Sequence, residues 1–280
     1  MSIETRSFQS SKEAMKFLEA LALGSNEFIF RGQPKSTDKL STTLHRLAGI
    51  HSDEQVKDLL RRFEIALANI GIVPFQKASR LDWLEYARHY GVPLPVIDFT
   101  YSPYVALFFA FNLMESKATH DLDSFVCVLA LNTLALSKGW AKATQKAWTN
   151  NDYYRFKTAD DTLFEAGFTA NTLQLIPFPG KRNRRMMRQI GLLLYDTLDY
   201  PSLGFTDIES FIESIEEEEL VPTLYKVYIH KQCAHSVFER LELMNLTGSH
   251  LFLDERGAAM DVINSYFYNS RVYFRDLDNQ

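Results

Sequence analysis

The chain has 280 residues, of which 46% are hydrophobic and 23% are charged, and its formal net charge is −5. This composition excludes a disordered or fibrous protein and is typical of a globular chain that can bury a substantial core. The negative balance argues against a protein that grips nucleic acid through its overall charge, so nucleic acid is not expected as a partner.

The amino-terminal stretch MSIETRSFQSSKEAMKF lacks the basic-then-apolar order of a secretory signal, and no apolar run approaches the roughly 18 residues of a membrane span. Two cysteines, Cys127 and Cys233, are too few for a disulfide framework. We therefore expect a cytoplasmic protein without a membrane partner. Because no linker or composition break divides the sequence, we expect a single domain over residues 1–280.

In the first half of the chain, apolar residues at helical spacing predict helices over about 10–24, 53–71 and 79–91, with an apolar strand over 28–31. The segment 92–100 is expected to be extended, because two prolines exclude helix there. Ser102-Pro103 then begins a helix in the favoured order of capping serine and first-turn proline. This helix, through Phe111, is apolar on every face and should lie buried against a sheet.

In the second half, strands are predicted over 124–131, 173–178, 191–197 and 223–230. Helical insertions are expected around 132–170, and further helices from Asp207, over 233–244 and over 254–267. Strands and helices therefore mix without regular alternation. This indicates an α+β fold with a mixed, mainly antiparallel sheet, continuous or split, flanked by helices.

The first stretch that carries chemistry is Phe28-Ile-Phe-Arg-Gly-Gln33, an apolar strand that ends on an arginine. The planar fork of Arg31 can hold a phosphate or a carboxylate through two hydrogen bonds. Gly32 lacks a side chain that would block a ligand's approach to the backbone, and Gln33 is grouped with it as ligand-binding. The alternative is that Arg31 is a structural arginine paired with a carboxylate.

The second stretch places polar side chains at the turns around one extended segment: His89 and Tyr90 before it, and Asp98, Thr100 and Ser102 at its end. Such turns suit contact with a ligand, and the backbone N–H groups at the helix start can receive an anion. In the alternative interpretation, Thr100 and Ser102 cap the helix, His89 satisfies a carbonyl and Asp98 pairs with an arginine.

The third stretch, 181–191, contains five cations within eight residues before an apolar strand. Arg185 and its neighbours could hold a pyrophosphate or an acidic partner, whereas Lys181 and Arg182 are better explained as a solvated basic surface. Gln189, at the mouth of the strand, could present its amide to the same cleft as Arg31. The sequence contains no P-loop, GxGxxG, HExxH or GxSxG motif, and its histidines and cysteines lack paired metal-ligand spacing. Neither a metal nor a required cofactor is expected.

Taken together, the segments FRGQ at 30–33, HYGVP at 89–93 with DFTYSPYVALFFAF at 98–111, and NRRMMRQIGLLL at 183–194 resemble the FRG domain family, named for its Phe-Arg-Gly motif. The order and spacing agree from Phe30 to about Ala259, including a closing element over 252–257. The chain departs from the family pattern at Pro95-Val96, where a Thr-Arg pair is usual, so an expected cation beside Asp98 is missing. Leu193 replaces a usual phenylalanine.

The layout is also similar, more loosely, to ADP-ribosyltransferases, which implies an ADP-ribosyltransferase-like fold and a nucleotide-binding cleft with NAD as substrate. Breaking the bond between nicotinamide and ribose passes through an oxocarbenium-like state, which needs a stabilising carboxylate. On this resemblance the catalytic residues would be Arg31, Asp98 and Gln189, with Asp98 or Glu255 supplying the charge. The ligand-binding residues would be Gly32, Gln33, His89, Tyr90, Thr100, Ser102 and Arg185, with Tyr90, Phe99 or Tyr101 stacking on nicotinamide.

Three functions follow from these observations. The first is an ADP-ribosyltransferase or NAD glycohydrolase that modifies a macromolecular target, in the setting of a bacterial toxin or phage-defence system that the resemblance implies. The second is a noncatalytic module that uses the same polar cleft to bind a nucleotide or a partner. The third is a nuclease-like or nucleic-acid-binding effector that uses the basic segment 181–188, an interpretation that the overall charge opposes.

Overall fold

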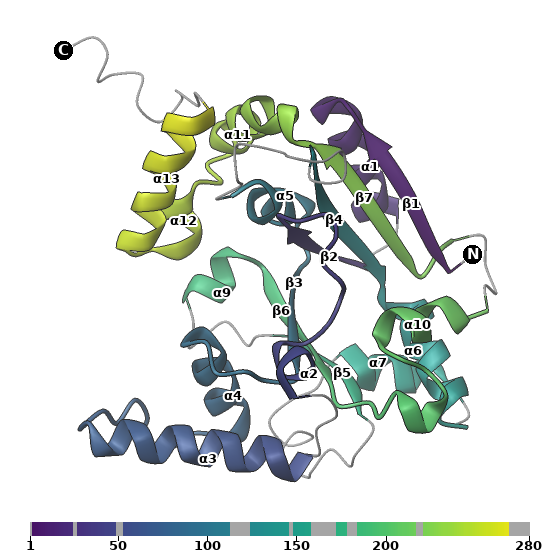
Figure 1. Ribbon diagram of the computed structural model, residues 1–280, viewed down its shortest axis with the longest axis vertical. Helices are drawn as coiled ribbons and strands as arrows, with labels where there is room; N and C mark the ends of the chain where they lie inside the picture. Colours follow the sequence, from purple (N-terminus) through teal and green to yellow (C-terminus); the bar gives the residue numbers. More distant parts are fainter. Residues whose placement is uncertain are drawn as a thin grey trace.

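The computed structural model describes residues 2–24, 27–48, 53–112, 124–145, 148–157, 172–177, 184–216 and 221–268. Their strands form one seven-stranded sheet in the order β1-β7-β4-β2-β3-β6-β5, in which β1 and β7 run parallel and the other described neighbours are antiparallel (Figure 1). The predicted mixed, mainly antiparallel sheet flanked by helices is confirmed. The strands are β1 (Ile3–Phe8), β2 (Phe28–Gln33), β3 (Val96–Thr100), β4 (Phe125–Asn132), β5 (Leu173–Pro177), β6 (Gly191–Asp196) and β7 (Leu224–His230).

The sheet is nearly split between β2 and β3. These two strands pair at a single position, Phe30 opposite Thr100, whereas β2 pairs with β4 along its whole length from Phe28 to Gln33. The sheet therefore consists of two halves, β1-β7-β4-β2 and β3-β6-β5, which diverge beyond this one pair. We call this place the seam.

Helices cover both faces of the sheet, and the predicted helices over 10–24, 53–71, 79–91, 103–111, 233–244 and 254–267 all form, some with slightly shifted ends. Among the described residues of the expected insertion over 132–170, two helices form, and its residues 146–147 and 158–170 lie outside the described ones. The longer helices are α1 (Ser11–Gly24), α3 (Asp53–Asn69), α4 (Arg80–His89), α5 (Pro103–Phe111), α6 (Thr133–Ala143), α7 (Asn150–Lys157), α10 (Ile208–Ser214), α11 (Ala234–Leu243) and α13 (Glu255–Tyr268). The short ones are α2 (Thr43–Ala48), α9 (Arg184–Arg188), α12 (Gly248–Phe252) and two 3-10 turns, η2 (Pro201–Leu203) and η3 (Lys231–Cys233).

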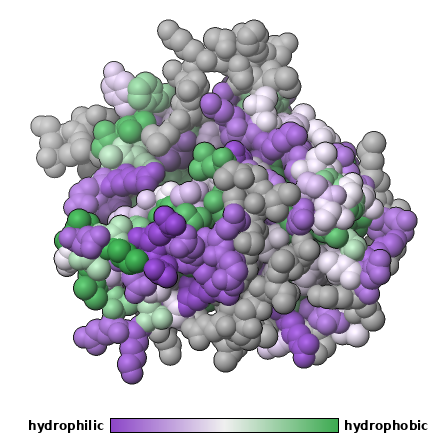
Figure 2. Space-filling view, turned by 60° about the horizontal axis from the view of Figure 1, so that its bottom comes forward, coloured by the Kyte–Doolittle hydropathy of each residue, from purple (hydrophilic) through white to green (hydrophobic). Residues whose placement is uncertain are grey.

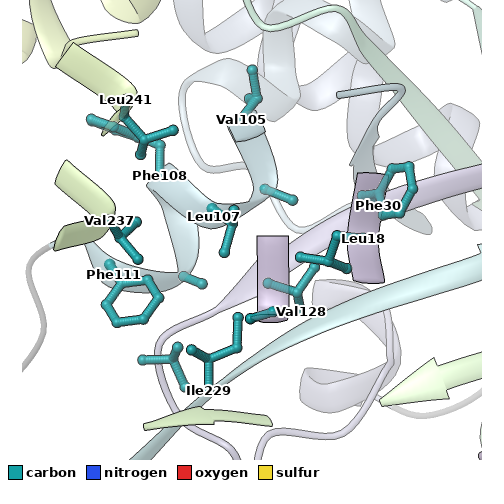
Figure 3. Packing of buried hydrophobic residues seen from close by; sticks show 14 of the residues in the cluster. Leu18, Phe30, Val105, Leu107, Phe108, Phe111, Val128, Ile229, Val237 and Leu241 are labelled. Atoms are coloured by element: carbon teal, nitrogen blue, oxygen red, sulfur yellow. The ribbon is translucent and has the colours of Figure 1, made fainter. Parts of the chain in front are cut away.

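Helix α5 is buried, as its sequence predicts, and is the centre of a hydrophobic cluster that we call the α5 cluster. Figure 3 shows its side chains Leu107, Phe108 and Phe111 among residues of the sheet and of α11. Ser102 caps the helix and Pro103 occupies its first turn, which fixes where it begins. The members labelled in Figure 3 are Leu18, Phe30, Val105, Leu107, Phe108, Phe111, Val128, Ile229, Val237 and Leu241.

The α5 cluster covers one half of one face of the sheet. Because Phe30 and Thr100 lie opposite each other, the side chains of Asp98 and Val96 are on the same face as Phe30. On that face, Val96 belongs to a separate cluster with α2, α3 and α4, which we call the α4 cluster. The opposite face carries one shared cluster that spans both halves, including Ile29 of β2 and Ile97 of β3.

None of the described helices is both long enough and apolar enough to cross a membrane.

Candidate functional site

A cleft of about 590 Å³ opens on the face of the sheet that carries the α5 and α4 clusters, at the seam. Its walls come from strands β2, β3 and β6 and from helices α4, α5, α9, α12 and α13. Apolar surface is supplied by Phe30, Phe99, Val105, Phe109, Leu193, Phe252 and Met260, among others. The polar lining consists of Arg31, Glu85, Arg88, His89, Asp98, Thr100, Asn112, Arg185, Gln189 and Arg256.

Arg31 and Asp98 meet where β2 and β3 diverge. The Nη1 atom of Arg31 donates a hydrogen bond of 2.8 Å to the backbone oxygen of Asp98 and lies 3.9 Å from its carboxylate oxygen Oδ2. The Arg31 side chain is 24% exposed. Burial lowers the pKa of the Arg31 guanidinium, and the Asp98 carboxylate opposes this effect. Arg31 therefore bridges the two halves of the sheet.

Arg88, in the last turn of α4, supplies the cation that the sequence pattern lacks beside Asp98. Its Nη2 forms a close ion pair with Asp98 Oδ2, so the carboxylate contacts arginines from two different elements. Arg88 was not predicted from the sequence, because it lies ten residues before Asp98 in the chain. The sequence offered one signal for Arg88, its position directly before His89 of the second stretch.

Gly32 is the point of closest approach between β2 and α5. A Cβ atom there would lie 2.0 Å from the backbone oxygen of Ala106 and 2.5 Å from the backbone nitrogen of Ala110. Gly32 lines the cleft, but its missing side chain is explained by the packing of a helix rather than by the approach of a ligand.

Thr100 and Gln189 connect the seam to the turn between α9 and β6. The Thr100 hydroxyl donates to the Gln189 backbone oxygen at 2.7 Å and accepts from the Ser102 backbone nitrogen at 3.0 Å. The Gln189 amide nitrogen Nε2 donates to the Leu251 backbone oxygen at 3.2 Å. Gln189 is thus in the same cleft as Arg31 and Asp98, and part of its amide is used to attach α12.

His89 and Arg185 lie together in the wall formed by α4 and α9. An Nη1 atom of Arg185 is 3.3 Å from His89 Nδ1, and the Arg185 guanidinium carbon lies 4.0 Å from the centre of the Phe252 ring. Arg256, from α13, lies 5.6 Å from the same ring. Burial lowers the pKa of His89, and the positive charge of Arg185 lowers it further.

Three of the seven predicted ligand-binding residues do not line the cleft. Ser102 uses its hydroxyl to cap α5, accepting from the Val105 backbone nitrogen at 3.3 Å. Gln33 is 4% exposed, and its Oε1 has no hydrogen-bond partner among the described residues. Tyr90 is 62% exposed and packs against Tyr86, with the ring centres 4.8 Å apart and the ring planes tilted by 48°.

Of the other candidates, Phe99 lines the cleft, whereas Tyr101 and Glu255 do not. A different glutamate, Glu85 of α4, is part of the lining, together with Arg256 and Phe252, which sequence reasoning also did not select. Lys181 and Arg182 lie outside the described residues. Across the described ranges, no group of three or more His, Cys, Asp or Glu side chains is arranged to hold a metal ion.

Comparison with known proteins adds one finding. The family model of the FRG domain matches residues 26–119. The matched span includes β2, α4, β3 and α5, and therefore Arg31, Arg88, Asp98 and Thr100, whereas α9, α12 and α13 follow it. No curated protein and no solved structure matches the chain.

Proposed function

Because the chain carries an FRG domain, we propose that its arginine-lined cleft binds a nucleotide such as NAD and that the protein transfers or hydrolyses the ADP-ribosyl group. One observation carries this proposal: a single cleft gathers Arg31, Asp98, Thr100 and Gln189 from three separate segments. The cleft volume falls within the range of small-molecule sites, about 300–1,000 Å³.

The proposed reaction breaks the bond between the ribose C1′ and the nicotinamide nitrogen. Nicotinamide leaves with the bonding electron pair, and the oxocarbenium-like ribose is attacked by water or by a nucleophile of a macromolecular target, which then loses a proton. The carboxylate of Asp98 would stabilise the developing positive charge. Its side chain is 41% exposed, and Arg31 and Arg88 fix its position.

The decisive measurement is the release of free nicotinamide when the purified full chain is incubated with NAD, with and without cell extract. Asp98→Asn removes the charge with little change of shape, and we expect release to fall by at least about tenfold. Asp58→Asn, on the exposed face of α3, is the matched control and should leave release unchanged. The absence of nicotinamide release from the wild-type chain, together with no NAD binding by calorimetry, would remove this function.

A second candidate function is a noncatalytic nucleotide-binding module. It is favoured by the engagement of the proposed catalytic groups in structural contacts: Asp98 contacts two arginines, and the Gln189 amide donates to Leu251. Calorimetric binding of NAD without any nicotinamide release, in the presence of cell extract, would select this candidate over the enzyme.

The proposal also includes a cytoplasmic effector of a bacterial toxin or phage-defence system, through the family resemblance described above. Controlled production of the protein in a bacterial culture tests it. Growth should stop with the wild-type chain and continue with Asp98→Asn produced to the same level. Equal growth of the two cultures would remove the effector setting.

A further inference from the structure

We propose that Arg185 of α9 and Arg256 of α13 form the phosphate-binding end of the cleft, and that Arg31 and Arg88 serve instead to position Asp98. This inference rests on the proposed function in taking the ligand to be a nucleotide. It assigns the anion to two residues that lie after the span matched by the family model.

The charges that line the cleft are unbalanced. Four arginines, Arg31, Arg88, Arg185 and Arg256, face two carboxylates, Glu85 and Asp98, so positive charge remains in excess. At the seam the Asp98 carboxylate contacts both Arg31 and Arg88. An anion that enters the cleft is therefore attracted more strongly to the other end, where Arg185 and Arg256 lie and the Asp254 carboxylate offsets part of their charge.

Arg185 and Arg256 approach one aromatic ring. Their guanidinium carbons lie 4.0 and 5.6 Å from the centre of the Phe252 ring, so two cations are gathered around one side chain. Burial lowers the pKa of Arg185 and the charge of Arg256 lowers it further, whereas the carboxylates of Asp254 and Asp98 oppose the shift. A phosphate placed between such guanidiniums relieves the repulsion and can accept paired hydrogen bonds.

The helix pair α12–α13 fixes Phe252 and Arg256 in this position. The Asp261 carboxylate of α13 accepts hydrogen bonds from the backbone nitrogens of Gly248 and Ser249 at the start of α12. Gly257 allows the two helices to touch, since a Cβ there would lie 2.4 Å from the Gly248 oxygen. The bond from Gln189 to Leu251 then attaches α12 to the α9–β6 turn. Arg185 and Arg256 are thus presented by a pre-organised wall.

The geometry favours a small nucleotide over a polynucleotide. Arg185 is partly buried and lines the cleft, whereas Arg184 and Arg188, its neighbours on α9, are exposed and do not line it. A polynucleotide backbone is usually bound along an open basic track. The ligand of the Arg185 and Arg256 end of the cleft is therefore the phosphate group of a mononucleotide or dinucleotide.

The test measures the binding of ADP and of inorganic pyrophosphate to the full chain by calorimetry. Arg185→Gln and Arg256→Gln should each weaken ADP binding by at least about tenfold, the loss expected for one charge-assisted hydrogen bond. Arg256→Lys, which keeps the charge and loses the fork, should give an intermediate loss. Arg62→Gln, on the exposed side of α3, is the matched control and should bind as the wild type does. The thermal midpoint of each variant verifies that it is folded.

The inference is overturned if neither probe binds the wild-type chain, if both glutamine variants bind ADP as the wild type does, or if the two arginines affect the binding of single-stranded oligonucleotides and not of ADP. The phosphate site and the proposed enzymatic function can be tested separately. ADP binding that depends on Arg185 and Arg256, without nicotinamide release, supports the phosphate site and removes the enzyme. Nicotinamide release with an unchanged KM for NAD in both variants supports the enzyme and removes the phosphate site.

Discussion

Asp196, at the end of β6, is a carboxylate that the fold has removed from water. It is 3% exposed, and its oxygens accept hydrogen bonds from the Leu198 backbone nitrogen at 3.1 Å and from the Tyr200 hydroxyl at 2.8 Å. Burial raises the pKa of Asp196 to about 6, although both hydrogen bonds oppose the shift. Tyr200 is buried as well, which raises the pKa of its hydroxyl, and the negative charge of Asp196 raises it further.

This raised pKa predicts a dependence of stability on pH. Since the folded value of about 6 exceeds the unfolded value of about 3.9, the folded state binds more protons between them. The stability that protonated Asp196 contributes to the folded state is therefore fully present below the unfolded pKa and is lost as the pH rises through the folded pKa. Asp196→Asn cannot ionise, so its free energy of unfolding relative to wild type should rise by roughly 2 kcal/mol between about pH 4.5 and about pH 7.5.

Guanidinium chloride unfolding of both proteins at the two pH values measures this difference, and Asp58→Asn, at an exposed position of α3, is the control. A stability difference between wild type and Asp196→Asn that is the same at both pH values would contradict the raised pKa.

At the scale of elements, the contact between β2 and α5 depends on one glycine. In Gly32→Ala the new methyl would lie 2.0 Å from the Ala106 oxygen, within backbone that cannot rotate away, so α5 must move. We expect a loss of about 3 kcal/mol in the free energy of unfolding, the upper part of the range for overpacked cores. Denaturant unfolding monitors it.

Gly24→Ala, at the end of α1, is the matched control, because a Cβ there meets nothing within 4 Å. It should change the free energy of unfolding by less than about 1 kcal/mol. Similar stabilities of the two alanine variants would show that α5 can shift away from β2 without cost.

Elements with a strong local signal were predictable from the sequence. Helix α5 has apolar residues on all sides and a Ser-Pro start, and its burial is confirmed. Strand β1 was missed because it is an edge strand without a buried residue, so its sequence shows no apolar alternation. Helices α2 and α12, with 6 and 5 residues, are too short for a helical period to be recognised.

The site was predictable where its residues lie in short motifs near the ends of strands β2 and β3. Arg31, Asp98 and Thr100 occupy positions near the seam that local motifs identify, and the structure brings them into one cleft with Gln189. Arg88 and Arg256 were not predictable, because their approach depends on how α4 and α13 pack against the sheet. Phe252 and Arg256 both belong to the closing element over 252–257, but their contact requires the turn between α12 and α13, which no periodicity in the sequence predicts.

At the scale of the whole molecule, the two faces of the sheet are organised differently. One face carries the shared cluster across both halves, whereas the other carries the α5 and α4 clusters with the cleft between them. On the face shown in Figure 2, hydrophilic and hydrophobic residues are mixed and do not form one large apolar patch. The buried apolar side chains of the described residues thus form three separate clusters. On the cleft face, the half β3-β6-β5 is covered by the α4 cluster, which is smaller than the α5 cluster.

This division predicts unequal stability of the two halves. A single residue pair joins β2 to β3, and the α4 cluster is smaller than the α5 cluster, so fewer buried contacts oppose opening of β3-β6-β5. Native-state hydrogen exchange should therefore give lower opening free energies for the amides of residues 96–100 and 191–196 than for those of 125–132 and 224–230. As denaturant is added, the opening free energies of residues 96–100 and 191–196 should fall first. The values of all four ranges should then converge at global unfolding.

A ligand that fills the cleft contacts both halves and is lost when either half opens, so it should raise both opening free energies by about RT ln(1 + [L]/Kd). ADP is the probe for this effect, and the Arg256→Gln variant at the same ADP concentration is its control. Identical opening free energies in both halves without ligand would show that the shared cluster alone unites the sheet into one cooperative unit. The seam would then be a feature of shape and not of stability.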